Sequence, residues 1–337
     1  MSTIIGFILI FTASFFQGSF YLPMTFTKEW EWENTWVVFS LFGMFVFNWM
    51  FVFLFIPNIL SIYAATPPGD IFILSLFGIT WGVGGILNGQ AMHRLGMALA
   101  FPIIGGLTTS CGALLPIIVF FPSALFTPRG LALILGTGVT VIGIIMCSRA
   151  ASDKQQRTES PAQTTGGSLA FNLAIAIAAG LFGSTLNIGL AFGESLVVEA
   201  RKLGVSDAYT VATNWAVVFT VGCVINILYC LYLMVKRNTM KKFFVPETVR
   251  NTGLGVLMGF IWSGSLFVYG MGISFLGKWG IVVGWVLFLT TGIIVGNLWG
   301  IWRGEWKGAA QQARSLLNRG LLVLILAIVV VALSNTL

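Results

Sequence analysis

The chain has 337 residues, of which 57% are hydrophobic and only 9% are charged. Soluble domains carry about 25% charged residues, so this depletion excludes a soluble globular protein and indicates one that crosses a membrane several times. The net charge of +7 then points to basic cytoplasmic loops rather than to nucleic acid. All four cysteines fall within apolar runs, which argues against both a disulfide framework and a zinc site.

Ten apolar runs are long enough to cross a bilayer as helices, which takes about 20 residues each. In chain order they cover about 3–22, 36–56, 70–92, 97–120, 129–148, 169–191, 209–235, 251–274, 279–302 and 319–336. The polar segment after the fifth run is rich in Ser, Thr, Gln and Gly, which favours a flexible cytoplasmic linker at 149–168. It separates five helices in residues 1–148 from five helices in residues 169–337.

The basic residues predict the orientation. Fourteen of the eighteen lysines and arginines lie in the loops that follow odd-numbered spans, and four lie on the other side. Loops rich in Lys and Arg stay in the cytoplasm. We therefore expect a multi-pass inner-membrane protein whose basic loops are cytoplasmic and whose termini are both outside.

An internal repeat connects the two halves. Residues 76–96 align without gaps to residues 257–277, and the matched positions include Trp81 with Trp262 and Gly78 with Gly259. The copies are the third and eighth spans, and this odd separation places them in opposite orientations. Inverted repeats of this kind are typical of secondary transporters. Glycines at four-residue spacing also predict close helix packing, which is the alternative explanation of the motif.

Four blocks of the sequence resemble those of a known family. The first comprises Phe20, Tyr21, Pro23, Lys28, Trp30, Trp32, Glu33 and Trp36. The second comprises Phe77, Gly78, Trp81, Gly82, Gly84, Met92, Leu95, Gly96 and Met97. Segments 202–209, with Asn226 downstream, and 303–309 follow in order. Over essentially its whole length the chain resembles the L-rhamnose–proton symporter family of the drug/metabolite transporter superfamily.

The resemblance implies an all-α membrane protein of ten helices in two inverted five-helix repeats, the drug/metabolite transporter fold. It also implies import of a deoxyhexose such as L-rhamnose with a coupling proton. At two positions the chain differs from the family pattern, and these differences weaken the inference that it shares the family's solute and coupling proton. The place near Gly280 is apolar where the family pattern has an acidic residue, and Ser265 stands where it has a glutamine. A drug or metabolite exporter and an uncoupled facilitator therefore remain alternatives.

A coupling group is hard to find, because no carboxylate lies in the middle of a predicted span. Carboxylates in the membrane are costly and usually functional. Glu194, close to the end of the sixth span, and His93 are the candidates for coupling or gating. We expect the other acidic residues, including Glu33 in the first loop, to be solvated loop charges. No cofactor or metal is expected beyond the coupling ion, which is a proton or sodium.

A sugar site needs amides for the hydroxyl groups and aromatic faces for the ring. The residues that suit this combination are Gln17, Tyr21, Trp81, Asn88, Trp262, Tyr269 and Trp285. Trp81 and Asn88 are seven residues apart, so they share a helix face, and Trp262 and Tyr269 repeat the spacing. Gln17 and Tyr21 are four apart and also share a face. Helix–helix hydrogen bonding is the alternative role for each amide.

Two other functional classes fit less well. A membrane enzyme would need clustered catalytic or metal-binding groups, and the chain has one histidine and scattered carboxylates. A sensor would need a loop long enough for a separate domain. The expected partners are thus a small neutral solute and the lipid bilayer, without nucleic acid, and the oligomeric state is open.

Overall fold

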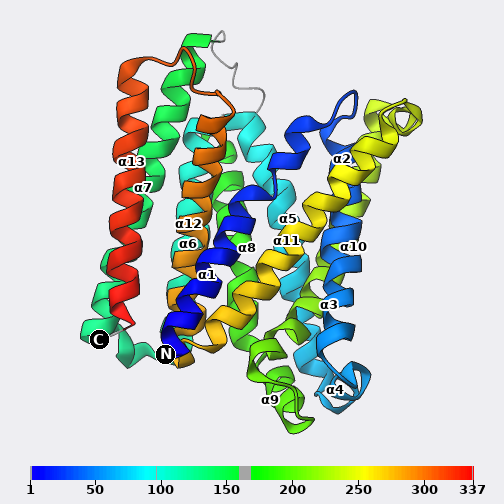
Figure 1. Cartoon of the computed structure of the whole chain (residues 1–337), viewed down its shortest axis with the longest axis vertical. Helices are drawn as coiled ribbons and strands as arrows, with labels where there is room; N and C mark the ends of the chain where they lie inside the picture. Colours follow the sequence, from blue (N-terminus) through cyan, green and yellow to red (C-terminus); the bar gives the residue numbers. More distant parts are fainter. Residues whose placement is uncertain (1, 96, 159–167, 336) are drawn as a thin grey trace. The chain divides into compact units, whose positions relative to one another are not determined.

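The computed structural model describes residues 2–95, 97–158, 168–335 and 337, and these residues form helices and short connections without any strand (Figure 1). Within this part of the chain, ten helices are long and apolar enough to cross a membrane, as the sequence predicts. Helices are the expected solution, because a helix satisfies its own backbone hydrogen bonds where no water is present.

The α-helices have the following bounds. They are α1 Ser2–Ser19, α2 Trp32–Phe39, α3 Asn48–Phe55, α4 Ile59–Ala65, α5 Pro68–Leu95, α6 Met97–Phe120, α7 Pro128–Thr158, α8 Leu169–Phe192, α9 Glu194–Lys202, α10 Asp207–Arg237, α11 Thr248–Ser274, α12 Gly280–Trp302 and α13 Gln311–Ser334. Four short 3₁₀ turns are η1 Leu22–Phe26, η3 Pro122–Phe126, η4 Met240–Phe244 and η5 Gly277–Trp279.

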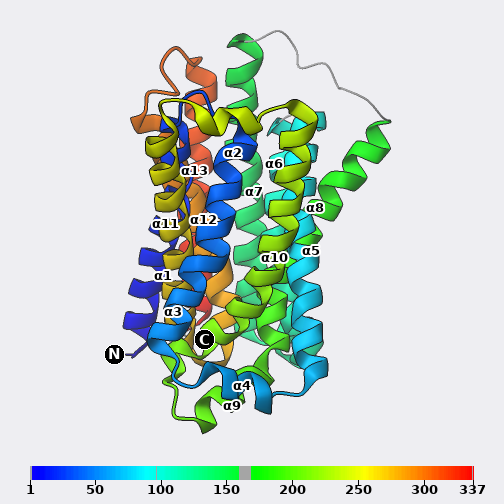
Figure 2. The same ribbon diagram turned by 90° about the vertical axis from the view of Figure 1, so that its right-hand side faces the viewer.

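The second span is not uniformly α-helical. Its middle, η2 Ser40–Phe47, is a π-helix, and it joins α2 to α3 in one continuous span beside α10 (Figure 2). Two indole nitrogens attach this span to α10. Trp36 Nε1 donates to Asn226 Oδ1 at 3.0 Å, and Trp49 Nε1 donates to Thr220 Oγ1 at 2.8 Å.

The chain divides into two compact units. The first consists of Met1–Val83 and Gly189–Gly277, and the second of Gly84–Ile188 and Lys278–Leu337. Helices α5 and α8 each pass from one unit into the other. The units therefore cut across the two predicted sequence halves, and each combines residues from both.

In the first unit the helices approach closely where both carry glycine. A Cβ atom added to Gly43 of η2 would lie 2.9 Å from the Gly259 Cα of α11. Where α1 crosses α11 (Figure 1), a Cβ added to Gly6 would lie 3.0 Å from the carbonyl oxygen of Gly272. Small residues permit such backbone contacts, and the dispersion gained there holds membrane helices together.

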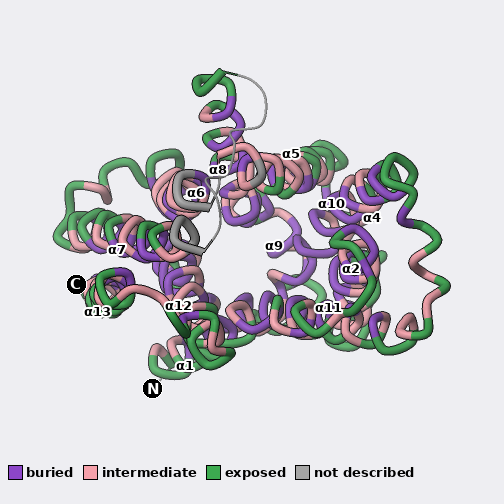
Figure 3. The backbone as a smooth tube through the Cα atoms, turned by 90° about the horizontal axis from the view of Figure 1, so that it is seen from above, coloured by how far each residue is buried: buried purple, intermediate pink, exposed green. Residues whose placement is uncertain are grey.

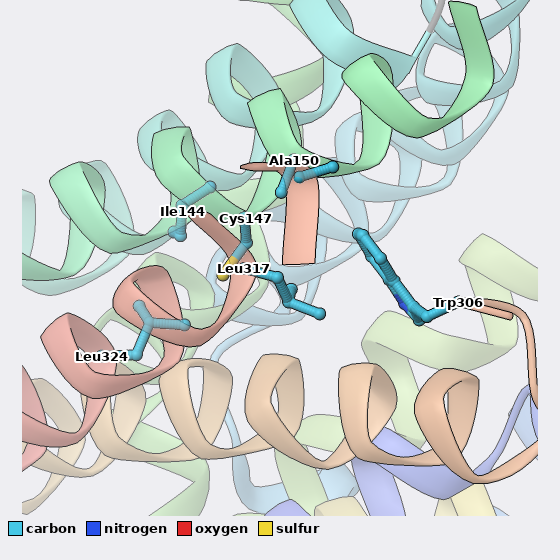
Figure 4. Close-up of a cluster of buried hydrophobic side chains, with 7 residues drawn as sticks. Ile144, Cys147, Ala150, Trp306, Leu317 and Leu324 are labelled. Atoms are coloured by element: carbon cyan, nitrogen blue, oxygen red, sulfur yellow. The ribbon is translucent and has the colours of Figure 1, made fainter. Parts of the chain in front are cut away.

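In the second unit α7 and α13 pack along their length around a buried cluster that includes Ile144, Cys147, Leu317 and Leu324 (Figure 4). Burial alternates around these helices (Figure 3). Leu324 is fully buried, while Leu326 on the same helix is 60% exposed. Exposed leucines of this kind suit a lipid-facing surface, because hydrocarbon is as apolar as the core.

The segment expected to form a flexible linker begins with a helical part. Helix α7 continues to Thr158, so residues 149–158 are helical rather than part of a flexible connection. These ten residues contain no Gly or Pro, and most are adequate helix formers, so the helix continues beyond its apolar part. Residues 159–167 of the expected linker lie outside the described part of the chain.

Candidate functional site

An aromatic cluster occupies the interior of the first unit. The indoles of Trp81 on α5 and Trp262 on α11 stack with centroids 5.9 Å apart and planes 21° apart. Phe219 of α10 lies 5.4 Å from Trp81 and 4.8 Å from Trp262, centroid to centroid. Trp215 stacks on Phe219 at 5.0 Å. Three helices thus bring four aromatic rings together, and we call these four residues the aromatic cluster.

Glycines set the position of Trp81. A Cβ on Gly78 would lie 2.6 Å from the carbonyl oxygen of Val218, so the backbones of α5 and α10 are in close contact at this point. A Cβ on Gly222 would lie 2.9 Å from the Trp81 ring, which therefore rests on the bare backbone of α10. The predicted packing role of the glycines in this part of the motif is confirmed.

The stacked indoles differ in exposure. Trp262 is only 5% exposed, whereas Trp81 is partly exposed. A flat, partly open indole backed by a buried one is a suitable surface for the C–H face of a sugar, because it gives contact area without losing side-chain freedom.

A polar pair lies next to this cluster along α11. Ser265 is fully buried, and its Oγ is 3.0 Å from Gln17 Oε1 of α1 and 2.7 Å from the backbone oxygen of Trp262. The serine hydroxyl thus reaches both a neighbouring helix and the backbone of the stacked indole. Gln17, which is partly exposed, keeps its amide NH₂ for another partner.

Two further predicted residues of this unit have other settings. Tyr21 lies beyond the end of α1 at Ser19, so the expected common helix face with Gln17 does not form. The chain turns there toward Pro23, and the Tyr21 ring stacks on Trp36 with centroids 5.7 Å apart. Tyr269 is fully buried on α11, so a solute can reach it only if this face of the helix opens.

The remaining predicted solute ligands belong to the second unit. Trp285 is 2% exposed, and its Nε1 donates to the backbone oxygen of Thr108 at 3.1 Å. Asn88 Oδ1 is buried and has no hydrogen-bond partner among the described residues. A buried, unpaired amide oxygen is costly, so Asn88 would gain from a ligand, as would Asn172, whose Oδ1 is also buried without a partner among the described residues.

Of the two predicted gating residues, only Glu194 has a side chain in the described part of the structure. Glu194 begins the short helix α9, its side chain is 64% exposed, and it pairs with Arg201 at 3.3 Å. Helix α8 ends two residues earlier, at Phe192, so Glu194 lies in α9 rather than in α8, within the candidate span Leu169–Lys202. His93 lies in α5, and its side chain is outside the described part of the structure. Among the described residues no group of His, Cys, Asp and Glu could hold a metal.

A family model described as L-rhamnose-proton symport protein matches residues 1–336. The chain belongs to this family. It is 27% identical over 315 residues to the L-rhamnose-proton symporter of Escherichia coli O1:K1 / APEC, which covers 91% of each chain. It is 26% identical over 337 residues to the L-rhamnose-proton symporters of Yersinia pestis (strain Pestoides F) and Yersinia pseudotuberculosis serotype O:1b (strain IP 31758). Those two matches cover 98% of this chain and 97% of each relative.

The prediction that Glu33 is a solvated loop charge is wrong for this family member. Glu33 is not a solvated loop charge, because it lies in the first turn of α2 with a fully buried side chain. Its Oε2 is 3.2 Å from Arg237 Nη1, and its Oε1 accepts a hydrogen bond from Thr239 Oγ1 at 3.0 Å. Both partners belong to the end of α10 and the turn after it.

The local cap explains the burial. Glu31 is the N-cap of α2 and forms a capping box with Asn34, which fixes where the helix begins. Glu31 itself is about half exposed and pairs with Lys242 at 2.5 Å. Asn34 Nδ2 donates to the backbone oxygen of Thr239 at 3.1 Å. The pattern Glu-x-x-Asn before an apolar run was the available signal, because it puts Glu33 inside the helix rather than before it.

Proposed function

We propose that this chain is a secondary transporter that imports L-rhamnose together with a proton by alternating access across the inner membrane. Family membership supports the solute class, since the relatives named above are L-rhamnose-proton symporters. The observation that supports a sugar site is the stacked pair of Trp81 and Trp262 beside Gln17 and Ser265. Aromatic faces and amide groups are what a neutral deoxyhexose needs.

The proposed solute ligands in the first unit are Trp81, Trp262 and Gln17. Tyr21 and Tyr269 are the other proposed ligands of that unit, and Asn88 and Trp285 are the proposed ligands of the second unit, considered by itself. Ser265 stands where the family pattern suggested a glutamine, and Gln17 brings an amide to the same place from α1. An amide at this site is thus compatible with a family-like solute despite the substitution.

The architecture that we propose is one expected of a secondary transporter. We propose that spans one to five and six to ten form inverted repeats of the drug/metabolite transporter fold, with basic loops in the cytoplasm and both termini outside. The match of Trp81 with Trp262 in the sequence repeat supports it, since the same two indoles stack on each other. No cofactor is needed in this scheme, because the ion gradient supplies the energy.

Purified protein in liposomes provides the test. Labelled L-rhamnose should accumulate when the external pH is lower than the internal pH, and a sodium gradient alone should not drive it. Uptake that equilibrates but ignores both gradients would establish a facilitator instead. Absence of rhamnose uptake and exchange in a folded preparation would contradict the proposal and favour an exporter of another solute.

A further inference from the structure

One asparagine of α10 is buried without using its amide. Asn214 is 1% exposed, and neither its Nδ2 nor its Oδ1 has a hydrogen-bond partner among the described residues. A side-chain amide offers two donors and an acceptor oxygen, and leaving them unused inside a protein costs free energy. Such a residue destabilises the fold unless another molecule bonds to it in some other state.

The other buried hydroxyl and amide side chains of α10 all have partners. Thr210 and Thr213 each donate to a backbone oxygen three residues earlier, at 3.1 and 2.7 Å. Asn226 uses both ends of its amide, donating to the backbone of its own helix at 2.9 Å and accepting from Trp36 at 3.0 Å. Asn214 is therefore the exception on a helix whose polar groups are otherwise satisfied.

The next residue adds a second unused donor. Trp215 is 1% exposed, and its Nε1 has no hydrogen-bond partner in the described part of the chain. Its ring stacks on Phe219, so this nitrogen lies at the edge of the aromatic cluster. Asn214 and Trp215 precede Phe219 by about one helical turn, on the side toward α9. Together they offer donors and an acceptor, which suits hydroxyl groups because each hydroxyl both donates and accepts.

A break in the sixth span covers this place. The candidate span Leu169–Lys202 consists of α8 and α9, and Gly193 between them has non-helical dihedral angles of φ −88° and ψ 17°. A Cβ on Gly193 would lie 2.5 Å from Asn214 Oδ1, so the amide packs against bare backbone. Ser195, two residues further on, has a buried Oγ that is also unpartnered within the described residues. Transporter sites are commonly built at interrupted helices of this kind.

Helix α9 lies over the beginning of α10. It packs against α10 and α4, and α4 and α9 lie together at the same end of the first unit (Figure 2). Its own charges are paired outside, since Arg201 binds both Glu194 and Asp207 and all three side chains are at least 49% exposed. The ionic groups of this end are thus used by one another, and the buried groups beneath α9 are neutral.

We propose that Asn214 and Trp215 form a subsite for hydroxyl groups of the transported sugar, between α9 and the rest of the aromatic cluster, and that the Gly193 break closes it in this structure. The inference rests on the proposed function and adds two ligands to it. Movement at Gly193 lifts the backbone from the Asn214 amide. Sugar hydroxyls then bond to Asn214 and to Trp215 Nε1, and Phe219 is the next ring that the sugar meets.

Stability and affinity should change in opposite directions when the amide is removed. Leucine has nearly the shape of asparagine without its polar atoms, so N214L should keep or raise the melting temperature measured without sugar. The same variant should bind L-rhamnose about tenfold more weakly, as expected for lost hydrogen bonds to a ligand. N214A lacks the same groups and should weaken binding equally, which provides a second variant that needs no fit beside Gly193.

Deoxy sugars identify the bond itself. Derivatives of L-rhamnose that each lack one hydroxyl group compete with labelled L-rhamnose on the purified protein. Wild type should bind at least one of them about tenfold more weakly than L-rhamnose, and N214L should bind that derivative and L-rhamnose equally. W215F, which keeps a ring beside Phe219 without the Nε1 donor, should lose discrimination at one hydroxyl as well. T213V is the matched control, because its hydroxyl is bonded within α10, and it should discriminate as wild type does.

The results that overturn the inference differ from those that overturn the function. If wild-type protein neither binds nor carries L-rhamnose, the proposed function fails. If wild type binds L-rhamnose and N214L and N214A bind it as tightly, or still discriminate against the same deoxy derivative, Asn214 is not a ligand. A clear fall in the melting temperature of N214L would show that the amide is bonded within the fold, and that it is kept for packing.

Discussion

Trp81 and Trp262 occupy equivalent positions of a repeat within the sequence, and in the folded chain their indoles stack on each other, 5.9 Å apart. They come from helices α5 and α11, and Phe219 of α10 packs against both. The inverted-repeat architecture that we propose would place a solute site near these two indoles, since sites in such transporters lie at the interface of the repeats.

Replacing the more exposed indole should affect binding more than folding. W81A should lower rhamnose affinity by at least tenfold, since it removes the open face of the pair. The cost to stability should be modest, about 0.5–1.5 kcal/mol for the lost ring pairing plus the lost burial. Uptake kinetics and thermal unfolding measure the two effects. W302A is the matched control, since Trp302 is 71% exposed and should change neither.

The bond between Gln17 and Ser265 can be isolated with a double-mutant cycle. Hydrogen bonds between membrane helices average about 0.6 kcal/mol, so S265A should lower stability slightly, and Q17A combined with S265A little further. For transport we expect Q17A to be the more damaging variant, because the amide is partly exposed and the serine is not. Equal transport by wild type and Q17A would assign both residues to packing alone.

The contact between Gly43 and Gly259 should be intolerant of any side chain. A Cβ at Gly259 would lie 2.6 Å from the Gly43 nitrogen, so G259A must push α11 away from η2 and lower the melting temperature. G264A is the control on the same helix, since a Cβ there meets nothing within 4 Å. Alanine stabilises a helix relative to glycine by about 0.5–1 kcal/mol, so G264A should be neutral or slightly stabilising. Equal melting temperatures for the two variants would contradict the close contact.

Glu194 provides a contrast with Glu33. It is 64% exposed and paired with a half-exposed arginine, and such surface pairs contribute roughly 0–1 kcal/mol. We expect E194Q to keep both stability and pH-driven uptake. A selective loss of pH-driven accumulation in E194Q would assign a coupling role to Glu194.

Hydropathy was sufficient to predict the ten spans, because about 20 apolar residues in hydrocarbon leave the backbone no alternative to a helix. The repeat was sufficient to single out Trp81 and Trp262. The composition of the compact units was not predictable, because α5 and α8 each contribute to both, and that depends on packing rather than on local pattern. The burial of Glu33 was missed for a similar reason. Its neutralising partner is about 200 residues away, and only the cap at Glu31 hinted at its place in the helix.

The π-helical middle of the second span has a consequence for helical phase. Trp36 and Trp49 are thirteen residues apart, and at 3.6 residues per turn that is about 3.6 turns, which would put the two indoles on nearly opposite faces. The wider turns of Ser40–Phe47 bring them back toward one side, where both bond to α10. The π-helical segment thus changes the helical phase between Trp36 and Trp49, which both bond to α10. Deleting one residue from it would turn Trp49 away from Thr220.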